Sequence, residues 1–565
     1  MEGVSGSDRK KTALDAVLLG ALFASGAAAL IYEIAWMRAL SLVVGSTTYA
    51  ISTMLAAFMS GLALGAYVGG IAADRTQNKL LAFGIVEAAI AVFGLLTFVV
   101  IRNMEPFYVW MFYKFRFSFH VFFVTQFVLA FFVMLVPTTL MGMTFPLALK
   151  GRARDLSAIG RDGGGLYSIN SLGAVAGSLA AGFVLIPLMG IKMSNFVAAG
   201  LNIAVAVVLI IVSRRGNNTG ALLVLIAALG LAPVIVFIKA PRHFDMAVNF
   251  YRAGLHRDKP DLKQLKSAHK LVYEKENAQG VVQVFSAAGQ WGNDHKYIAT
   301  NGKIEGSVAR TGIGDAVRYS SGDWANQLLL AYLPLEANPG AKSFFNIGLG
   351  TGATFMAALG DKGIERAVCV DIQPLVYEAV EKFFFPDIFK DARAEFAVAD
   401  ARNYLSRTTE KYDIISSEPS YPTDEGMSNL FSVEFFELVR SRLNEGGVFA
   451  QWLPGYLLTG VDEQIMIRTF GTVFKNAYVW SIESSGDVIM IGAMVPFGMD
   501  EARIKSAVAG RRLADAIGKE YRLWLMPEDV RKIVVADGEL NTDDRPYIEF
   551  VAARSVLARH AAAVR

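Results

Sequence analysis

The sequence predicts a multi-domain membrane protein, in which an α-helical transmembrane bundle precedes a small antiparallel β domain and an open α/β domain. Seven long apolar stretches lie within residues 1–240, whereas residues 241–565 have the charged composition of an ordinary globular protein. An Asn-Gly pair at 301–302 stands among short β-like runs, which is a hairpin signal. At 343–355 a short apolar run enters a glycine-rich turn and then a helix-compatible stretch.

The composition narrows the classes of protein further. Of the 565 residues, 53% are hydrophobic, and the mean hydropathy is +0.39, which is too apolar for an ordinary soluble enzyme. A net charge of +3 gives no argument for nucleic-acid binding. The single cysteine, Cys369, excludes an internal disulfide framework, and we expect it to be a buried, inert thiol of a core strand.

Each of the seven apolar stretches is long enough to cross a bilayer. The fourth contains Pro137 and Pro146, so we expect it to kink or partly re-enter the membrane. Residues 107–119 are aromatic and carry Lys114 and Arg116, which is typical of a segment in the membrane interface. The predicted spans are residues 14–36, 48–72, 79–101, 120–149, 165–187, 193–213 and 219–239.

Small and ionisable residues within the spans carry different information. The spacing of Gly61, Gly65 and Gly69 favours close helix packing. Glu33 and Glu87 stand at membrane depth, where a carboxylate is costly, so each pairs within the bundle or faces a substrate.

The charges that flank the spans do not fix the orientation, because Lys and Arg are almost equally numerous on the two sides. Residues 69–75 resemble the cytoplasmic loop after the second helix of major-facilitator transporters, which would place the α/β half outside. A nucleoside-type cofactor is cytosolic and argues for the opposite side. We therefore expect a cytoplasmic α/β half.

The junction and the small domain follow the last span. We interpret residues 241–268 as a linker and 269–340 as a small antiparallel β domain, with strands near 270–274, 281–285 and 295–300. Residues 323–335 have helical apolar spacing that should end at Pro334, and this helix should pack on the following sheet.

Residues 341–500 form the predicted α/β domain, followed by a C-terminal α/β extension over 501–565. Glycines 348, 350 and 352 let the backbone approach a ligand beside a helix N-terminus. Asp371 stands about twenty residues after Gly350 at a strand end, where an acidic residue accepts hydrogen bonds from ribose. Asp400 ends the next strand and could accept from an adenine amino group; for both aspartates a helix cap is the alternative.

The residues of these motifs limit the kind of cofactor and reaction that the α/β domain can support. The glycine turn includes no Lys or Arg, and there is no Gly-Lys-Ser/Thr, so a nucleoside cofactor without phosphates fits better than a dinucleotide. Glu418 ends the fourth strand, where a carboxylate could act as a base toward a reacting amine; an exposed loop carboxylate is the alternative. The sequence suggests neither a metal-ligand cluster nor a Ser-His-Asp set.

Taken together, these residues resemble the spermidine synthase family, in particular bacterial proteins in which that domain follows transmembrane helices. The likeness extends over nearly the whole chain. In the soluble half it rests on residues 301–303, 347–352, 370–372, 400–405, 418–420, 446–452 and 540–546, and in the membrane half on 31–34, 137–142 and 166–170.

The resemblance implies a Rossmann-like methyltransferase-type domain that transfers an aminopropyl group from decarboxylated S-adenosylmethionine to a diamine. It places Glu418 where the family has its catalytic base. The cofactor-binding positions that it implies are Gly348, Gly350, Gly352, Asp371 with Ile372 at the ribose, and Asp400 with Ala401 at the adenine.

The chain departs from the family where the amine binds. Tyr421-Pro422 replaces an Asp-Pro pair, residues 323–327 replace a Tyr-His-Glu segment, and the family glutamine is displaced to Gln279. Gln279 and Tyr421 are therefore the candidate substrate-binding residues. The cofactor half of the site is better supported than the amine half.

Three functions remain open at this point. The first is a membrane-embedded aminopropyltransferase with Glu418 as its base. The second is a transferase that uses S-adenosylmethionine and acts on a lipid or hydrophobic acceptor, and the third is a transporter or sensor with an altered synthase-like domain. The expected partners are an amine or lipid acceptor and the membrane, with a homodimer as one option and without nucleic acid or metal. The expected location is the bacterial inner membrane.

Overall fold

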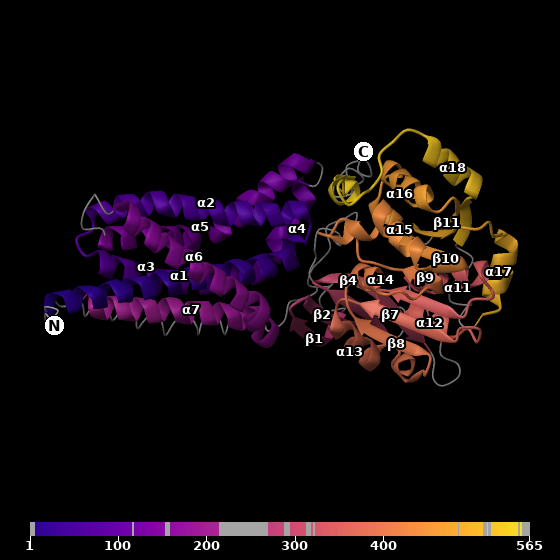
Figure 1. The fold of residues 1–565 in the computed structure, drawn as a ribbon, viewed down its shortest axis with the longest axis horizontal. Coiled ribbons are helices and arrows are strands. Elements are labelled where there is room, and N and C mark those ends of the chain that lie inside the picture. The colour runs from indigo at the N-terminus through magenta and orange to yellow at the C-terminus, as the bar shows by residue number, and fades with distance from the viewer. Residues whose placement is uncertain are drawn as a thin grey trace.

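The computed structural model places a helical half at one end of the molecule and an α/β half at the other (Figure 1). It describes residues 6–115, 118–152, 159–213, 269–287, 294–311, 318–319, 323–483, 485–511, 517, 521–551 and 554–555.

The helical half contains long helices that run side by side along the molecule, as Figure 1 shows. Within the described residues, five segments are long and apolar enough to cross a membrane. The helices are α1 (Gly6–Val44), α2 (Thr48–Arg75), α3 (Lys79–Asn103), α4 (Glu105–Phe115), α5 (Phe119–Arg152), α6 (Ile159–Ala180), the π-helical turn η2 (Ala181–Leu185) and α7 (Ile186–Val212).

The last of the five segments, Ile159–Val212, contains two of the predicted spans. It is interrupted at Gly190, whose φ of 77° and ψ of 170° are not helical. The two arms correspond to the spans predicted at 165–187 and 193–213. The span predicted at 219–239 lies outside the described residues.

Helix α5 continues through both of its prolines. Pro137 has no N–H to donate to the carbonyl of Val133, four residues earlier. Thr97 of α3 donates its hydroxyl to that carbonyl instead, over 3.4 Å. A neighbouring helix thus satisfies the freed group, which is how transmembrane helices tolerate proline.

The glycines of α2 bring it into direct contact with α5. A Cβ atom on Gly61 would lie 1.8 Å from the hydroxyl of Thr138, and one on Gly65 would lie 2.0 Å from the carbonyl of Thr139. The packing interpretation of this small-residue spacing is confirmed. Glu87 of α3 also pairs inside the bundle, because it accepts a 2.6 Å hydrogen bond from Asn202 of α7.

The small β domain is a five-stranded antiparallel sheet in the order β1-β2-β3-β4-β5. Asn301 and Gly302 form the β3–β4 turn with φ values of 51° and 76°, which is the left-handed pair that a type I′ hairpin needs. The strands are β1 (His269–Asn277), β2 (Gly280–Ala287), β3 (Asp294–Thr300), β4 (Lys303–Thr311) and β5 (Arg318–Tyr319).

The α/β half is built on an eight-stranded sheet in the order β13-β11-β12-β10-β9-β6-β7-β8, in which β10, β9, β6, β7 and β8 are parallel. Its strands are β6 (Ser343–Ile347), β7 (Arg366–Asp371), β8 (Ala394–Val398), β9 (Tyr412–Ser417), β10 (Leu443–Leu453), β11 (Asn476–Ile482), β12 (Asp487–Ala493) and β13 (Tyr521–Leu525). Its helices are α11 (Trp324–Ala337), α12 (Ala353–Leu359), α13 (Pro374–Phe383), η4 (Pro386–Lys390), α14 (Ala401–Arg407), η5 (Met427–Leu430), α15 (Val433–Ser441), η6 (Gly455–Leu457), α16 (Gly460–Val473), α17 (Glu501–Ala509) and α18 (Pro527–Val535).

Helix α11 packs on this sheet as predicted, but it does not end at Pro334. It continues to Ala337, because Ser416 of β9 donates its hydroxyl to the carbonyl of Leu330 over 3.0 Å. That carbonyl is the one that Pro334 leaves without a helical N–H. Cys369 of β7 is fully buried, as predicted.

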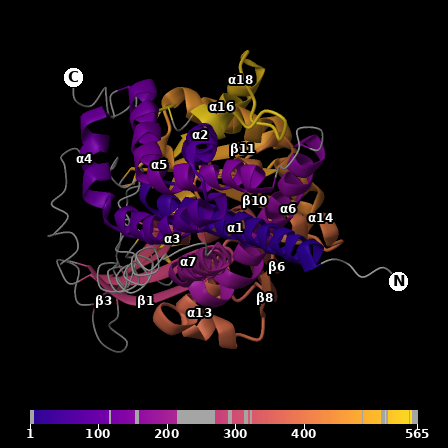
Figure 2. The ribbon, with the colours of Figure 1, turned by 90° about the vertical axis from the view of Figure 1, so that its left-hand side faces the viewer.

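The end of the bundle meets the α/β half directly. Viewed along the bundle, the helices lie in front of the two sheets (Figure 2). Arg38 of α1 donates to the backbone carbonyls of Asn277 and Ala278 over 2.9 and 2.8 Å. Glu276 accepts from the N–H of Ile191, just after the break in α7, over 3.1 Å.

Candidate active site

The predicted site residues lie where the parallel sheet changes direction. Strands β6 and β9 are neighbours, but the chain continues from β6 toward β7 and β8 on one side and from β9 toward β10 on the other. Ligands of open α/β sheets bind at the carboxyl ends of strands at such a switch point. Gly348 follows β6 and Glu418 follows β9, and a Cβ atom on Gly348 would lie 2.9 Å from the carbonyl oxygen of Glu418.

The glycine turn requires glycine for its backbone conformation. Gly348, Gly350 and Gly352 have φ values of 81°, 52° and 86°. Residues other than glycine rarely adopt these φ values. The turn leads into α12.

Asp371 stands at the end of β7 and holds this turn in place. Its Oδ2 accepts the backbone N–H of Leu349 over 2.8 Å, and its Oδ1 accepts that of Gln373 over 2.8 Å. Burial raises the pKa of the Asp371 carboxyl, and the two hydrogen bonds oppose that rise. Each oxygen keeps a further lone pair, so the same carboxylate can still accept ribose hydroxyls.

Asp400 caps helix α14, so its predicted alternative role is realised. Its Oδ1 accepts the backbone N–H of Asn403 over 2.7 Å. In the described part of the chain its Oδ2 has no hydrogen bond. Near this strand end the Ile372 side chain is half exposed, whereas Ala401 is almost fully covered. Apolar side chains of this kind suit the face of a purine.

Glu418 is a carboxyl in a low-dielectric, acidic environment rather than an exposed loop carboxylate. Thr354 of α12 contacts its Oε2 at 3.0 Å. Burial raises the pKa of Glu418 to about 8, the Thr354 hydroxyl opposes this rise, and the charges of Asp323, Asp487 and Glu305 add to it. A carboxyl with such a pKa can take up a proton near neutral pH.

The three neighbouring carboxylates belong to elements that are far apart in the sequence. Asp323 precedes α11 and accepts from the hydroxyl of Ser307 over 2.7 Å. Asp487 begins β12 and accepts from the indole N–H of Trp452 over 3.1 Å, and its pKa is raised by burial to about 7. Glu305 lies on β4.

We define Glu305, Asp323, Glu418 and Asp487 as the acidic cluster. Sequence reasoning named Glu418 as the candidate base and noted Asp323 as part of a replaced segment, but it missed Glu305 and Asp487. The antiparallel pairing of β10 with β12 brings Asp487 to Trp452, and no local sequence pattern predicts that pairing.

Tyr421 lies beside this cluster together with Lys303, a buried cation that sequence reasoning did not single out. The Lys303 ammonium lies 3.9 Å from the centre of the Tyr421 ring, 3.1 Å from Asp424 and 3.5 Å from Glu305. Tyr456 donates its hydroxyl to that of Tyr421 over 2.9 Å. The lysine side chain is only 6% exposed.

Gln279 lies elsewhere. It is exposed in the β1–β2 turn, where its backbone N–H donates to the side chain of Asn277 over 3.0 Å. The contacts of the described residues connect this turn to the bundle through Arg38, and they do not connect the Gln279 side chain to Glu418.

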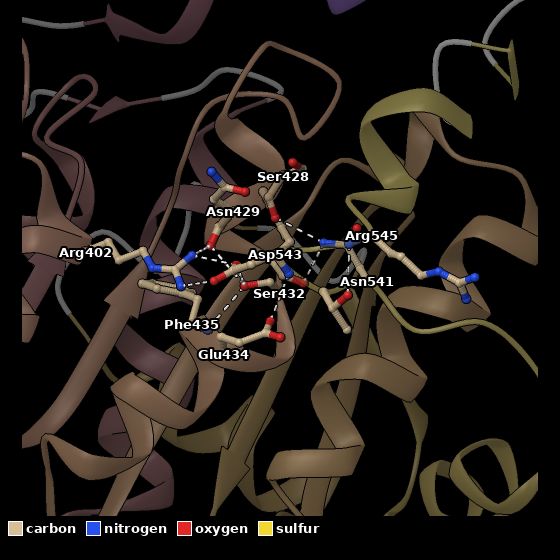
Figure 3. A network of polar contacts seen from close by, with 11 residues as sticks. Arg402, Ser428, Asn429, Ser432, Glu434, Phe435, Asn541, Asp543 and Arg545 are labelled. Carbon is tan, nitrogen blue, oxygen red and sulfur yellow. Dashed lines mark hydrogen bonds and ion pairs between the residues drawn. The ribbon is translucent and has the colours of Figure 1, made fainter.

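The motif at 540–546 forms a network of polar contacts with Arg402 and with residues 428–435 (Figure 3). Asn541 is fully buried, and its amide donates to the carbonyls of Ser428 and Phe431, both over 3.1 Å. Asp543 pairs with Arg402 of α14 and accepts from Ser432 over 2.7 Å. One segment thus fixes both the helix that Asp400 caps and the chain that follows Glu418.

Comparisons with known proteins find a family model, curated proteins and solved structures that are similar to this chain. Residues 324–482 match the family model described as the spermine/spermidine synthase domain. The polyamine aminopropyltransferase of Thermotoga neapolitana is 31% identical over 124 residues, which are 22% of this chain and 42% of that protein. That of Saccharolobus solfataricus is 34% identical over 161 residues, which are 27% of this chain and 52% of that protein. The solved spermidine synthase of Thermotoga maritima matches with a TM-score of 0.36 and 19% identity, over 47% of this chain and 87% of that structure.

The chain thus spans about half the length of the curated relatives it matches. The matched region contains the glycine turn, Asp371, Asp400 and Glu418. The predicted resemblance of the soluble half to the spermidine synthase family is confirmed, and the relatives are transferases, as the resemblance implied.

Proposed function

We propose that this chain is a membrane-embedded transferase that moves an aminopropyl group from decarboxylated S-adenosylmethionine to an amine. The observation that carries the proposal is the position of Glu418. Its partly buried carboxyl, with a pKa of about 8, follows β9 directly beside the glycine turn of β6, at the switch point of the sheet.

The cofactor side of the proposal uses the residues around the glycine turn. Asp371 would accept the ribose hydroxyls through the lone pairs that Leu349 and Gln373 leave open. Asp400 would accept the adenine amino group, with Ile372 and Ala401 against the purine. Gly348, Gly350 and Gly352 would let the adenosyl group lie against the backbone.

The acidic cluster favours the decarboxylated donor over S-adenosylmethionine. The decarboxylated compound ends in a single ammonium group, whereas S-adenosylmethionine also carries a carboxylate. That carboxylate would meet Glu305, Asp323 and Asp487 in a buried site, where repulsion between like charges is strong.

In the transfer step, the nitrogen of the neutral acceptor amine attacks the carbon of the aminopropyl group that is bonded to the sulfonium sulfur. A carbon–nitrogen bond forms, and the carbon–sulfur bond breaks with its electron pair going to sulfur. The proton that leaves the nitrogen goes to the Glu418 carboxylate. The products are the aminopropylated amine and methylthioadenosine.

The helical half would anchor this transferase as a multi-pass protein of the inner membrane, with seven spans and the α/β half on the cytoplasmic side. The five apolar segments of the described residues support the membrane location. The pairing of Glu87 with Asn202 favours anchoring over a substrate path at that position. Tyr421, at the acidic cluster, is the proposed substrate-binding residue, whereas the exposed position of Gln279 in the β1–β2 turn does not support that role.

Calorimetry with the two donors tests the cofactor assignment. The full chain in detergent should bind decarboxylated S-adenosylmethionine at least tenfold more tightly than S-adenosylmethionine, because of the acidic cluster. If neither compound binds, the enzymatic proposal is wrong. If S-adenosylmethionine binds more tightly, a methyltransferase is the better reading.

A further inference from the structure

The carboxyl edge of the parallel sheet faces the end of the helical bundle. After β9 the chain turns at Tyr421–Asp424, and the N–H of Glu425 donates to the carbonyl of Ser46, in the loop between α1 and α2, over 3.2 Å. A second contact lies beside it, because the Glu549 carboxylate accepts from Thr48 of α2 and, over 2.8 Å, from Ser428.

The cofactor side is connected to the bundle as well. The side chain of Gln373, which follows Asp371, accepts a 2.6 Å hydrogen bond from the amide of Asn277. The backbone carbonyl of Asn277 in turn accepts from Arg38 of α1. Both strand ends that hold the candidate site are therefore connected to the bundle, the β9 side directly through Glu425 and the β7 side through Asn277 of β1.

An apolar groove opens at this same end of the bundle, between α3, α4 and α5. Helix α4 lies at the junction with the α/β half (Figure 1). The hydroxyl of Tyr108 donates to the carbonyl of Val44 over 3.3 Å, two residues before Ser46. Phe107, the residue before Tyr108, lines the groove, which has a volume of about 620 Å³, so this end of the groove lies near the loop that contacts Glu425. It is lined by Val99, Val100, Asn103, Met104, Phe107, Leu129 and Val133.

An ammonium group of the protein itself, that of Lys303, already lies beside the acidic cluster. Lys303 lies over the Tyr421 ring and between Asp424 and Glu305, which is the environment that a second ammonium of a diamine would need. A diamine would have to displace or avoid this buried cation. An acceptor with one amine has no such conflict.

We propose that the acceptor is an amphiphilic primary amine taken from the membrane surface, with its amine at Glu418 and its alkyl chain in the groove between α3, α4 and α5. This inference rests on the proposed aminopropyl transfer and specifies its acceptor. The groove supplies apolar surface that each buried methylene group of the chain would remove from water, and the acidic cluster attracts the cationic head.

The test measures transfer by the full chain in lipid nanodiscs with decarboxylated S-adenosylmethionine and three acceptors: butylamine, dodecylamine and 1,4-diaminobutane. We expect kcat/KM for dodecylamine to exceed that for each of the two short amines at least tenfold. Leu129→Trp should fill the groove and lower kcat/KM for dodecylamine at least fivefold, with butylamine changed less than twofold. Val124→Trp, at an exposed position of the same helix outside the groove, is the matched control and should change neither.

The possible results distinguish a failure of the amphiphilic acceptor from a failure of the proposed aminopropyl transfer. Transfer to 1,4-diaminobutane that equals or exceeds transfer to dodecylamine would overturn the amphiphilic acceptor and leave aminopropyl transfer intact. A chain-length preference that survives Leu129→Trp would overturn the groove as the chain site. Absence of transfer to all three amines would overturn the proposed function itself.

Discussion

The backbone N–H of Leu349 donates to the Asp371 carboxylate over 2.8 Å, so the residue expected to hold a ribose also holds the glycine turn. The other oxygen of Asp371 accepts the N–H of Gln373. One carboxylate therefore fixes two backbone segments on either side of the cofactor position. The proposed ribose-binding role of Asp371 would therefore coincide with this structural role.

Asp371→Asn should weaken adenosyl binding at least tenfold, which corresponds to about 1.4 kcal/mol. The new amide NH₂ would face the N–H of Leu349 or Gln373, donor against donor, so the melting temperature should fall as well. Calorimetry with decarboxylated S-adenosylmethionine gives the affinity. Asp387→Asn, at a side chain that is 91% exposed, is the control and should change neither quantity. Unchanged affinity in Asp371→Asn would contradict the ribose assignment.

Glu418→Gln should keep cofactor binding and lower kcat by about 10²–10⁴-fold, which is the usual contribution of a general base. The amide has nearly the same shape and can still contact Thr354, but it cannot accept the amine proton. Glu425→Gln changes an exposed carboxylate of the same loop and should leave kcat unaltered. Full activity of Glu418→Gln would rule out the base assignment.

The pH dependence follows from the raised pKa of Glu418, about 8 in the folded chain against about 4.3 for an ordinary glutamate. The base works only when ionised, so kcat/KM should rise with pH through about 8. Stability should change in the opposite direction. The folded state holds the proton more tightly than the unfolded state, so the stability that this group contributes below about pH 4 is lost as the pH rises through 8.

Glu418→Gln supplies the control for both effects. The melting temperature of the variant should fall less between pH 6 and pH 9 than that of the wild type. Asp487, with a pKa of about 7, titrates in the same window and remains in both proteins. If the melting temperatures of the two proteins fall equally between pH 6 and pH 9, Glu418 does not titrate in that range.

Lys303→Met should lower the melting temperature of the α/β half by about 6 °C or more. The lysine is buried and pairs with Asp424 and Glu305, and removing one partner of a buried charge pair costs about 3–5 kcal/mol. Lys505→Met breaks a partly exposed pair with Glu501 at 2.8 Å and should shift it by less than about 2 °C. The same Lys303 variant should gain activity toward 1,4-diaminobutane relative to butylamine.

Asn541→Ala should destabilise the chain that follows Glu418. The substitution leaves the carbonyl of Phe431 and the N–H of Ile548 without their side-chain partner, at a cost of about 1–3 kcal/mol for each group. The carbonyl of Ser428 still accepts the N–H of Phe431. We expect a lower melting temperature and a lower kcat. Arg545→Ala removes a side chain that points away from this network (Figure 3) and should have little effect. If the two variants melt alike, the network does not support the site.

The sequence predicts best those features that a local rule determines. Helices α2 and α3 begin at the residues predicted for them and extend two or three residues beyond the predicted ends. The Asn301-Gly302 hairpin matches its prediction because positive φ leaves few alternatives. Helix α11 passes through Pro334 only because Ser416, from a distant strand, satisfies the carbonyl of Leu330. Proline alone predicts a helix end there, and a tertiary contact overrides it.

Some residues of the candidate site follow from a local rule, and others depend on tertiary contacts. The glycine turn, Asp371 and Glu418 are predictable because each ends a recognisable strand. Glu305 and Asp487 join Glu418 only through sheet pairings, which spacing along the chain does not reveal. The contact between Glu425 and Ser46 joins the two halves of the protein and has no sequence pattern of its own.

The most direct test is to identify the products formed by the full chain from decarboxylated S-adenosylmethionine and a primary amine, by mass spectrometry. We expect methylthioadenosine and the aminopropylated amine in equal amounts from the wild type, and neither above background from Glu418→Gln. A methylated amine as the product, or equal product from the wild type and Glu418→Gln, would contradict aminopropyl transfer with Glu418 as the base.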